Sequence, residues 1–314
     1  MFSKLKGKTI LITGGTGYFG KVLTEHLCKI NVDHSLDLRI ILSARNPVKL
    51  TGIEFVKSDI RKPLKVDGNI DFIIHAATPV ANDKSESSDL LDIIINGTQK
   101  ILNLALEKKS SKIINISSGS IYGAQPQNIE FLPESFSKDV SLFNSSNIYG
   151  SGKLIAENIV QNFCRNNNIN YLTLRCFAFS GKYLPLDAQF AIGNFVRDAK
   201  TSGIIKIKGD GSAIRSYLDS SDMADWVTTA LMSSISGKTY NVGSEHAISI
   251  LDLAHLVASL VPGTKVEIEN SLSREIKTNR YIPSVAKIMN ELKVTQKVSL
   301  KQSIENMINF ERDQ

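Results

Sequence analysis

The sequence has few cysteines, and the three that it has lie far apart. Cys28, Cys164 and Cys176 are odd in number and widely spaced, which argues against a disulfide framework and against a zinc site. The five histidines form no metal-binding pattern either, because even the closest pair, His246 and His255, is nine residues apart. We therefore expect a protein that binds no metal and folds in a reducing compartment.

Long apolar runs are also missing. The N-terminus is basic, but the apolar run that follows it covers only residues 9–12, which is too short for the core of a signal peptide. No later segment has the apolar length that a helix needs to cross a bilayer. We expect a cytoplasmic protein with no membrane partner.

The basic residues form no dense stripe. The formal net charge is +6, but the lysines and arginines are scattered and no aromatic residues alternate with them. This distribution favours a mildly basic surface over nucleic-acid binding, and the charge also suits a diphosphate-carrying ligand. A chain of 314 residues, 42% of them hydrophobic, is expected to fold as one large domain or two unequal ones.

The first half of the chain alternates short apolar runs with longer amphipathic stretches. Several runs are continuously apolar, which is typical of strands buried on both faces. The alternation predicts an α/β fold with a doubly wound parallel sheet. We predict strands over residues 8–13, 38–43, 53–57, 71–75, 112–117 and 170–175, and helices over about 17–30, 87–109 and 148–166.

The pattern becomes less regular after about residue 176. We see no linker and no internal repeat, so we expect a larger domain over 1–175 and a smaller, partly interwoven α+β lobe over 176–314. In this second part we predict helices near 187–200, 221–231, 249–260 and 300–310, and strands at 204–208, 239–242 and 266–268.

A glycine-rich turn follows the first predicted strand and opens the first predicted helix. Gly14, Gly17 and Gly20 are spaced three residues apart. Glycines permit a tight turn, let a pyrophosphate approach backbone N–H groups and let helix and strand pack closely. The helix N-terminus adds positive potential for phosphates. At the start of a parallel α/β pattern, this turn predicts a Rossmann-type dinucleotide site.

The end of the second strand indicates which dinucleotide is bound. An acidic residue there would hydrogen bond the ribose 2′-hydroxyl of NAD and repel the 2′-phosphate of NADP. The chain has Ser43 with Arg45 close behind, and a hydroxyl plus a guanidinium suits a phosphate. We predict NADP, with NAD as the alternative in which Arg45 is an exposed loop residue. Asp59 is placed to accept a hydrogen bond from the adenine amino group.

A tyrosine and a lysine four residues apart open the helix predicted over 148–166. Tyr149 and Lys153 share a helix face, although this spacing is common by chance. Ser118 lies upstream, at the end of the fifth strand. A hydroxyl, a phenol and an ammonium group are therefore expected to meet at the C-terminal edge of the sheet, where open α/β sheets bind ligands.

With these motifs, the chain resembles the extended short-chain dehydrogenase/reductase family, particularly its NAD(P)-dependent nucleotide-sugar epimerases, reductases and dehydratases. Further matching segments lie at residues 96–98, 174–181, 209–217 and 240–244, so the resemblance covers nearly the whole chain. It is specific for the family and does not select one member. It implies an enzyme that binds a dinucleotide in residues 1–175 and a nucleotide-sugar in residues 176–314.

The resemblance implies a role for each matching residue. Tyr149 would be the general acid/base, Lys153 would bind the nicotinamide ribose and lower the pKa of the tyrosine, and Ser118 would hydrogen bond the reacting oxygen. The residues expected at the cofactor are Gly14, Thr16, Gly17, Tyr18, Phe19, Gly20, Ser43, Arg45, Asp59, Ile60, Ala76, Ala77, Thr78, Asn96, Tyr149 and Lys153.

The substrate side is implied in the same way. Asn194, Arg215 and Arg280 would hold the nucleotide diphosphate, and Ser120 and Ser118 would lie near the sugar. Either arginine could instead be a surface residue. The resemblance also implies a homodimer in which the helices over 87–109 and 148–166 pair with their counterparts.

The chain departs from the family pattern at several positions. The 4,6-dehydratases of the family carry an Asp-Glu pair directly after the Ser118 position, whereas this chain has Gly119 and Ser120, which disfavours that mechanism. Ala178 stands where many members have an asparagine, and Lys182 replaces the proline of the usual aromatic-Gly-Pro turn. We therefore expect substrate placement to differ from that of many members.

Several functions remain open from the sequence. The first is hydride transfer at C4 of a nucleotide-diphosphate sugar, by a 4-keto reductase or a C4 epimerase. A sugar-nucleotide dehydratase and a carbonyl reductase for a small apolar ketone are alternatives within the enzymes. A dinucleotide-sensing protein without turnover is the alternative outside them, and the presence of Ser118, Tyr149 and Lys153 together disfavours it.

Overall fold

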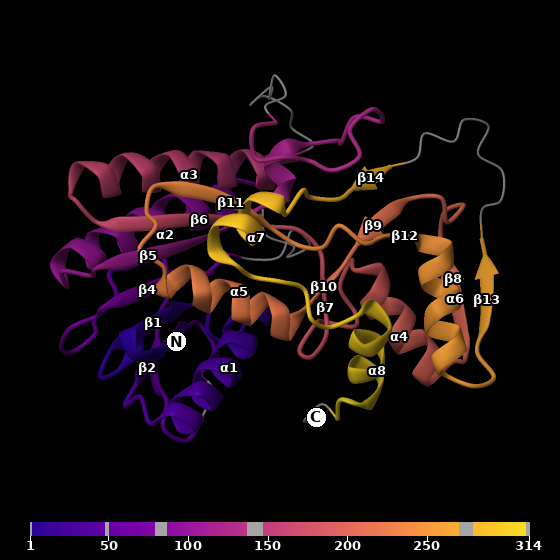
Figure 1. Cartoon of the computed structure of the whole chain (residues 1–314), viewed down its shortest axis with the longest axis horizontal. Coiled ribbons are helices and arrows are strands. Elements are labelled where there is room, and N and C mark those ends of the chain that lie inside the picture. The colour runs from indigo at the N-terminus through magenta and orange to yellow at the C-terminus, as the bar shows by residue number, and fades with distance from the viewer. Residues whose placement is uncertain (1, 48–49, 79–86, 137–146, 270–278, 312–314) are drawn as a thin grey trace. The chain divides into compact units, whose positions relative to one another are not determined.

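The computed structural model describes residues 2–47, 50–78, 87–136, 147–269 and 279–311 (Figure 1). The contacts within the chain divide it into two compact units. Unit 1 consists of Met1–Gly123, Ser137–Cys176 and Ala224–Tyr240, and unit 2 of Ala124–Phe136, Phe177–Met223 and Asn241–Gln314.

Unit 1 contains a seven-stranded sheet with the order β11-β6-β5-β4-β1-β2-β3. The pairings from β1 to β6 are all parallel, which confirms the predicted fold class. Every residue of β1 and β5 is buried, because helices cover both faces of the central strands, and this explains their continuously apolar sequences. The strands are β1 (Thr9–Thr13), β2 (Arg39–Ala44), β3 (Glu54–Lys57), β4 (Phe72–His75), β5 (Lys112–Ser118), β6 (Asn170–Cys176) and β11 (Lys238–Val242).

The strand order reverses at β1, which lies between β2 and β4. The chain winds outward from β1 through β2 to β3, then returns to β4 and continues through β5 to β6. Helices that follow β1 and β4 therefore begin at the same edge of the sheet, at the point where doubly wound folds bind their ligands. The topology places the glycine turn and the end of β5 at one edge.

The helices α1 (Tyr18–His34), α2 (Ser87–Glu107) and α3 (Ile148–Asn166) of unit 1 lie where the amphipathic pattern predicts them, and α1 extends four residues further than expected. The short helices η1 (Phe2–Leu5) and η2 (Gly119–Tyr122) were not predicted. The predicted helix α5 (Ser220–Met232) begins in unit 2 and continues into unit 1. Figure 1 shows α2 and α3 lying along the same side of the sheet. Their close approach depends on Gly152, where a Cβ would lie about 3 Å from the side chains of Leu91 and Ile94.

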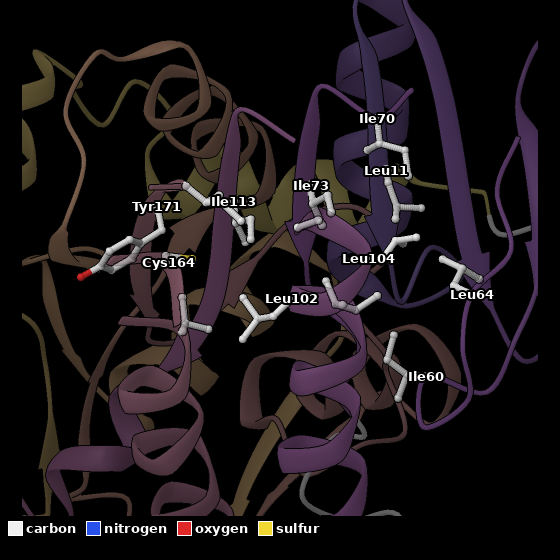
Figure 2. Packing of buried hydrophobic residues seen from close by; sticks show 14 of the residues in the cluster. Leu11, Ile60, Leu64, Ile70, Ile73, Leu102, Leu104, Ile113, Cys164 and Tyr171 are labelled. Carbon is white, nitrogen blue, oxygen red and sulfur yellow. The ribbon is translucent and has the colours of Figure 1, made fainter. Parts of the chain in front are cut away.

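A hydrophobic cluster lies between these helices and the sheet (Figure 2). Leu102 and Leu104 of α2 and Cys164 of α3 pack toward Ile73 and Ile113 of the central strands. Each is less than a twentieth exposed, so burial of this apolar surface is the main stabilising contribution in unit 1.

Unit 2 is built from small sheets and short helices. β10 pairs with β7, β9 pairs with both β12 and β14, and β13 pairs with β8. Its strands are β7 (Phe179–Ser180), β8 (Ile204–Ile207), β9 (Ile214–Ser216), β10 (Leu218–Asp219), β12 (Ala247–Ser249), β13 (Lys265–Ile268) and β14 (Arg280–Tyr281). Its helices are α4 (Ala191–Thr201), α6 (Ile250–Leu260), α7 (Ala286–Leu292) and α8 (Leu300–Asn309).

The division of the chain differs in detail from the single boundary expected after residue 175. The chain passes from unit 1 to unit 2 between Cys176 and Phe177, but Ala224–Tyr240 returns to unit 1, because β11 extends the sheet beside β6. Ala124–Phe136 belongs to unit 2, where Leu132 pairs with Pro283. Among the described helices, none combines the length and apolar character that a bilayer crossing requires.

Candidate active site

The glycine turn is shaped to receive a phosphate group. Gly17 is the N-cap of α1 and, having no side chain, supplies no side-chain cap to the helix. Gly14 has a φ of +72°, and a Cβ there would lie 2.9 Å from the carbonyl oxygen of Ala76. A Cβ at Gly20 would collide with the backbone of Gly15. Side chains at these positions would fill the turn. Because the positions are glycines, the pyrophosphate of a dinucleotide can approach the backbone N–H groups.

The other residues of the turn lie near the expected places. Thr16, Tyr18 and Phe19 are partly exposed, and the rings of Tyr18 and Phe19 meet edge to face with centroids 5.6 Å apart. The sequence motif did not single out Gly15, whose hypothetical Cβ would lie 2.7 Å from the Cβ of Leu42. Gly15 therefore allows the turn to pack on β2.

A buried chain of hydrogen bonds runs from Thr98 through His75 to Thr13, the residue that precedes the glycine turn. Thr98 Oγ1 donates to the carbonyl of Ile94 (2.6 Å) and therefore accepts from His75 Nε2 (3.2 Å). His75 Nδ1 then accepts from Thr13 Oγ1 (2.8 Å), which itself accepts from the backbone N–H groups of residues 76–77. His75 is thus the neutral, Nε2-protonated tautomer. Burial, and after it the charge of a nearby lysine, lowers the pKa of His75 to about 3.

The end of β2 carries the two residues expected to select the cofactor. Ser43 is buried, and its carbonyl accepts a hydrogen bond from the N–H of Gly15 (3.0 Å). Arg45 is exposed, and its charge helps to lower the pKa of Asp59. Arg45 and Asp59 therefore face the same region, where the adenosine end of a dinucleotide is expected.

Asp59 has a partner that the sequence did not predict. Arg61 Nε contacts both carboxylate oxygens of Asp59 (3.0 and 3.2 Å), and its Nη2 donates to Oδ2 (2.6 Å). The hydrogen bond from Arg61 is the main reason why the pKa of Asp59 falls to about 2. Arg61 also contacts Asp89 and Asp92 of α2 (2.5 and 3.5 Å). Asp59 keeps lone pairs for an adenine amino group, but Arg61 already orients it.

Ile60 and Asn96 do not present their side chains to this region. Ile60 is buried, and its side chain lies where a Cβ of Gly97 would be, so only its backbone is available to a ligand. Asn96 is exposed on α2, and its amide donates to Asp92. Ile94 and Thr98, its neighbours on α2, are buried instead.

Ser118 is held at the end of β5 by the short helix η2. Its Oγ accepts a hydrogen bond from the N–H of Ser120 (3.1 Å). Asn147 Nδ2 donates to the Ser120 carbonyl (2.7 Å), while Asn147 Oδ1 caps α3 by accepting from the N–H of Gly150 (3.1 Å). A Cβ at Gly150 would lie 2.5 Å from the Ser120 carbonyl oxygen. Asn147 and Gly150 therefore fix the start of α3 against η2.

Tyr149 reaches Ser118 from the first turn of α3, and Lys153 lies one turn further along the same helix. The Tyr149 phenol hydrogen bonds with the Ser118 side chain, and Lys153 Nζ lies 5.9 Å from the centroid of the Tyr149 ring. Lys153 Nζ donates to Thr78 Oγ1 (2.7 Å) and to the Ile116 carbonyl (2.9 Å). The structure thus brings together the serine, tyrosine and lysine, with Thr78, at the C-terminal edge of the sheet.

Burial dominates the electrostatics of this group. It raises the pKa of the Tyr149 phenol to about 12, and the hydrogen bond with Ser118 opposes this rise. It lowers the pKa of Lys153 to about 8, and Cys176 and Glu157 oppose this fall. Cys176, which pairs with Ser118 across β5 and β6, is also buried, and burial strongly raises the pKa of its thiol. The sequence motif did not single out Cys176.

Arg215 lies in unit 2 among aromatic side chains. Its Nη1 donates to the carbonyls of Ile214 and Asn279 (both 2.8 Å). Burial lowers the pKa of Arg215, and Tyr217 and Tyr281 oppose this fall. Tyr281 pairs with Arg215 across the parallel strands β9 and β14, so the two side chains share a face.

Arg280 and Asn194 do not join Arg215. Arg280 pairs with Ile214, which places it on the opposite face of the sheet from Arg215, and its Nε is buried without a hydrogen-bond partner. Asn194 lies on α4, where its Oδ1 accepts from Arg197 (3.4 Å). Among the described residues, no hydrogen bond connects these three predicted substrate ligands.

The comparison with protein families is decisive for the affiliation of the chain. The model of the NAD dependent epimerase/dehydratase family matches residues 10–243. The chain belongs to this family. The match spans the glycine turn, the end of β5 and the tyrosine–lysine helix, which confirms the resemblance noted from the sequence.

Individual relatives of this family member are distant. UDP-glucuronic acid decarboxylase 2 of Arabidopsis thaliana is 25% identical over 316 aligned residues, covering 97% of this chain and 68% of the relative. UDP-glucose 4-epimerase of Thermotoga maritima, solved with UDP-glucose, superposes with a TM-score of 0.80 at 19% identity, covering 96% and 97% of the two chains. dTDP-glucose 4,6-dehydratase of Bacillus anthracis, solved with NAD, gives a TM-score of 0.77 at 21% identity, covering 96% and 95%.

These comparisons identify an NAD-dependent enzyme family that acts on nucleotide sugars. The family member described here carries the hydroxyl, phenol and ammonium groups expected of an enzyme, and its fold is that of the solved epimerase and dehydratase. Within the described residues, no group of three His, Cys, Asp or Glu side chains could hold a metal ion.

Proposed function

We propose that this family member transfers a hydride at C4 of a nucleotide-diphosphate sugar, as a 4-keto reductase or a C4 epimerase. The observation that carries the proposal is the group of Ser118, Tyr149 and Lys153 at the end of β5. Gly119 and Ser120 supply no acid–base pair beside it, which disfavours elimination of water. The chemistry available is therefore proton and hydride transfer at one carbon.

The nicotinamide and three side chains have separate roles in the proposed reaction. The nicotinamide supplies or accepts the hydride. Tyr149 gives its proton to the C4 oxygen when a ketone is reduced and removes it when an alcohol is oxidised, while Ser118 hydrogen bonds the same oxygen. Because the pKa of Tyr149 is raised to about 12 by burial, the phenol is protonated at neutral pH and is ready to act as the acid. The Lys153 ammonium favours the ionised phenol when the reaction runs toward oxidation.

A reductase and an epimerase differ in the fate of the cofactor. A reductase releases the oxidised dinucleotide after each turnover, whereas an epimerase keeps it and returns the hydride to the opposite face of C4. We favour NADP as the cofactor, because the end of β2 carries the exposed Arg45, close behind Ser43, and has no acidic residue. The preference for NADP favours the reductase over the epimerase, since NADPH is the usual external reductant.

The decarboxylase relatives favour a second candidate. Oxidation at C4 of a sugar with a carboxylate on C5 creates a β-keto acid, which loses CO2 readily. UDP-glucuronic acid decarboxylases are among the relatives that match nearly the whole chain. The serine–tyrosine–lysine group would perform the same first step, so release of CO2 distinguishes this candidate from the epimerase and the reductase.

A panel of nucleotide sugars tests the proposal. Thermal shifts with UDP, GDP, CDP and dTDP identify the base, because only the bound diphosphonucleoside stabilises the protein. Sugars with that base, UDP-glucuronic acid included, are then incubated with NADPH and with NADP⁺, and the products are separated. A C4-reduced or C4-inverted sugar supports the proposal, a 4-keto-6-deoxy sugar or a pentose with CO2 overturns it, and turnover of small apolar ketones alone indicates a carbonyl reductase.

The cofactor assignment has its own test. Arg45→Glu replaces the guanidinium with a carboxylate that would repel a 2′-phosphate. We expect the variant to lose affinity for NADPH by at least about tenfold and to bind NADH as well as or better than the wild type. Equal affinity of the wild type for NADH and NADPH, unchanged in the variant, would refute the NADP assignment.

We also propose a cytoplasmic homodimer. All three cysteines are free in the structure, which suits a reducing compartment. Leu106 of α2 and Ile155 of α3 are large apolar side chains with 46% and 36% exposure, and both belong to the helices expected to pair. Light scattering tests the dimer, and Leu106→Glu with Ile155→Glu is expected to yield monomers.

A further inference from the structure

A buried ion pair joins α3, the helix that carries Tyr149 and Lys153, to the strand β6. Glu157 of α3 and Arg175 of β6 have side chains that are only 9% and 13% exposed, and Arg175 Nη2 donates to Glu157 Oε2 (2.8 Å). Arg175 Nε also contacts both carboxylate oxygens (3.1 and 3.2 Å). Burying an ion pair is unfavourable unless its geometry is very good, and the proton-transfer scheme above does not use this one.

The ion pair connects the elements that carry the reacting groups. Ser117 of β5 donates to Glu157 Oε1 (2.5 Å), and Arg175 Nη1 donates to the hydroxyl of Tyr122 in η2 (2.9 Å). Lys153 donates to the carbonyl of Ile116. Consecutive residues of β5 therefore hold consecutive turns of the same face of α3, Ile116 at Lys153 and Ser117 at Glu157.

Charge also links Glu157 to Lys153. Among the described residues, the ionisable groups that interact with the buried Lys153 ammonium are Cys176 on β6, Glu157 on its own helix and His75 on β4, with the Tyr149 ring beside it. Burial keeps the histidine, the thiol and the phenol uncharged near neutral pH. Of these groups, Glu157 is the one whose charge can offset the burial of the ammonium.

We propose that Glu157, fixed by Arg175 and Ser117, is a positioning residue that holds Lys153 in place and keeps it charged for dinucleotide binding. Arg175 in turn keeps the carboxylate in one orientation, and Tyr122 extends the support to η2, which carries Ser120. The proposal concerns the cofactor side of the site. It therefore does not depend on the identity of the sugar.

The pH dependence of dinucleotide binding tests this role without any substrate. The affinity for NADPH, followed by its fluorescence, should fall as pH rises through the Lys153 pKa of about 8, because the ammonium that binds the ribose is lost. Glu157→Gln removes the carboxylate charge and moves this fall to lower pH. If the pKa of Lys153 drops to about 7, the variant binds roughly eightfold more weakly than the wild type at pH 8.5 and less than twofold more weakly at pH 6.5.

Two matched variants separate charge from packing. Glu157→Asp and Arg175→Lys keep both charges but disturb the geometry of the pair, so they should lower the melting temperature without moving the midpoint of the binding curve. Lys153→Met should remove the pH dependence in this range. If Glu157→Gln does not fold, the double variant Glu157→Gln/Arg175→Gln, which leaves no unpaired charge, should show a shift in the same direction, smaller because the positive charge of Arg175 is lost as well.

The outcomes are distinct. A midpoint that moves in Glu157→Gln and stays in place in Glu157→Asp supports the proposal. Two results overturn the proposal and leave the ion pair with a role in stability alone. In the first, the midpoint is the same in the wild type and in Glu157→Gln, Glu157→Asp and Arg175→Lys. In the second, the midpoint moves in Glu157→Asp and Arg175→Lys as far as it does in Glu157→Gln. Because NADPH binding is the readout, failure of the C4 chemistry would not change either result.

Discussion

The serine–tyrosine–lysine group and the expected substrate ligands differ in whether the structure brings them together. Ser118, Tyr149 and Lys153 are tied by hydrogen bonds to η2, β5 and Thr78, and a buried ion pair lies behind them. In unit 2, Arg215 and Arg280 lie on opposite faces of a short sheet. A reaction shared by a family needs fixed geometry, whereas the choice of sugar can change when a few residues on short elements change. Variants in the serine–tyrosine–lysine group and at the two arginines test this difference.

The largest effect is expected at the phenol. Tyr149→Phe removes the proton donor while keeping the ring beside Lys153, so turnover should fall by about a thousandfold. The Kd for NADPH should remain close to the wild-type value. Tyr171→Phe, a buried residue at the opposite end of β6 from Cys176, is the matched control and should keep its activity. Full activity of Tyr149→Phe would refute the acid/base assignment.

Ser118→Ala should have the next largest effect. It removes a hydrogen bond to the reacting oxygen and should reduce turnover by about a hundredfold. It also removes the hydrogen bond that opposes the raised pKa of Tyr149, so alcohol oxidation should require a higher pH than in the wild type. Ser120→Ala keeps the backbone bonds of η2 and should cost less, and a pH profile for each variant checks the difference.

The two arginines of unit 2 provide the test on the substrate side. Arg215→Lys keeps the positive charge but loses the planar fork that suits a diphosphate, so KM should rise by about tenfold with little change in kcat. Arg280→Lys should have a smaller effect if the diphosphate lies on the Arg215 face of the sheet. Equal losses in both variants would show that the diphosphate is held from both faces, contrary to this expectation.

The last effect concerns stability at low pH rather than activity. The pKa of His75 in the folded protein is about 3, below its value of about 6.5 in an unfolded chain, because the neutral ring is buried. The stabilisation that it provides is complete above pH 6.5 and is lost as pH falls toward 3. Between pH 7.5 and 5, this amounts to about 2 kcal/mol of unfolding free energy.

Urea unfolding at several pH values measures this contribution. His75→Asn is expected to be less stable at pH 7.5 but to lose less stability on acidification than the wild type. The exposed His246→Asn should follow the wild-type curve. A wild-type protein that unfolds equally at pH 7.5 and 5 would contradict the assignment of His75 as a buried neutral ring.

The sequence predicted the first half of the fold better than the second, for physical reasons. Strands such as β1 and β5 are buried on both faces and read as apolar runs, and α3 begins and ends at the residues that its pattern predicts. The strands β7, β9, β10, β12 and β14 have only two or three residues each, too few for any periodicity to be visible. Contacts formed in three dimensions define these short strands.

The same limit applies to the site. A sequence motif identified Ser118, Tyr149 and Lys153. Arg61 lies only two residues from Asp59, but whether their side chains meet depends on side-chain orientation, which no motif encodes. Glu157 and Arg175 lie on a helix and on the strand that follows it, so only the folded structure brings them together. Asn96 was expected at the cofactor because residues 96–98 match the family pattern, and the structure shows it exposed on α2. Asn147 could have been found as the polar residue that precedes the helix of Tyr149.

The fate of the hydrogen on C4 tests the central claim most directly. A nucleotide sugar labelled with deuterium at C4, carrying the base that the thermal shifts identify, is mixed with the enzyme and NADP⁺, and the dinucleotide and the sugar are analysed by mass spectrometry after a single turnover. We predict that with the wild-type enzyme the deuterium appears on the nicotinamide, as for a reductase, or is retained at C4 of the inverted sugar, as for an epimerase, and that Tyr149→Phe gives neither product. Deuterium that exchanges into water during turnover would contradict hydride transfer at C4.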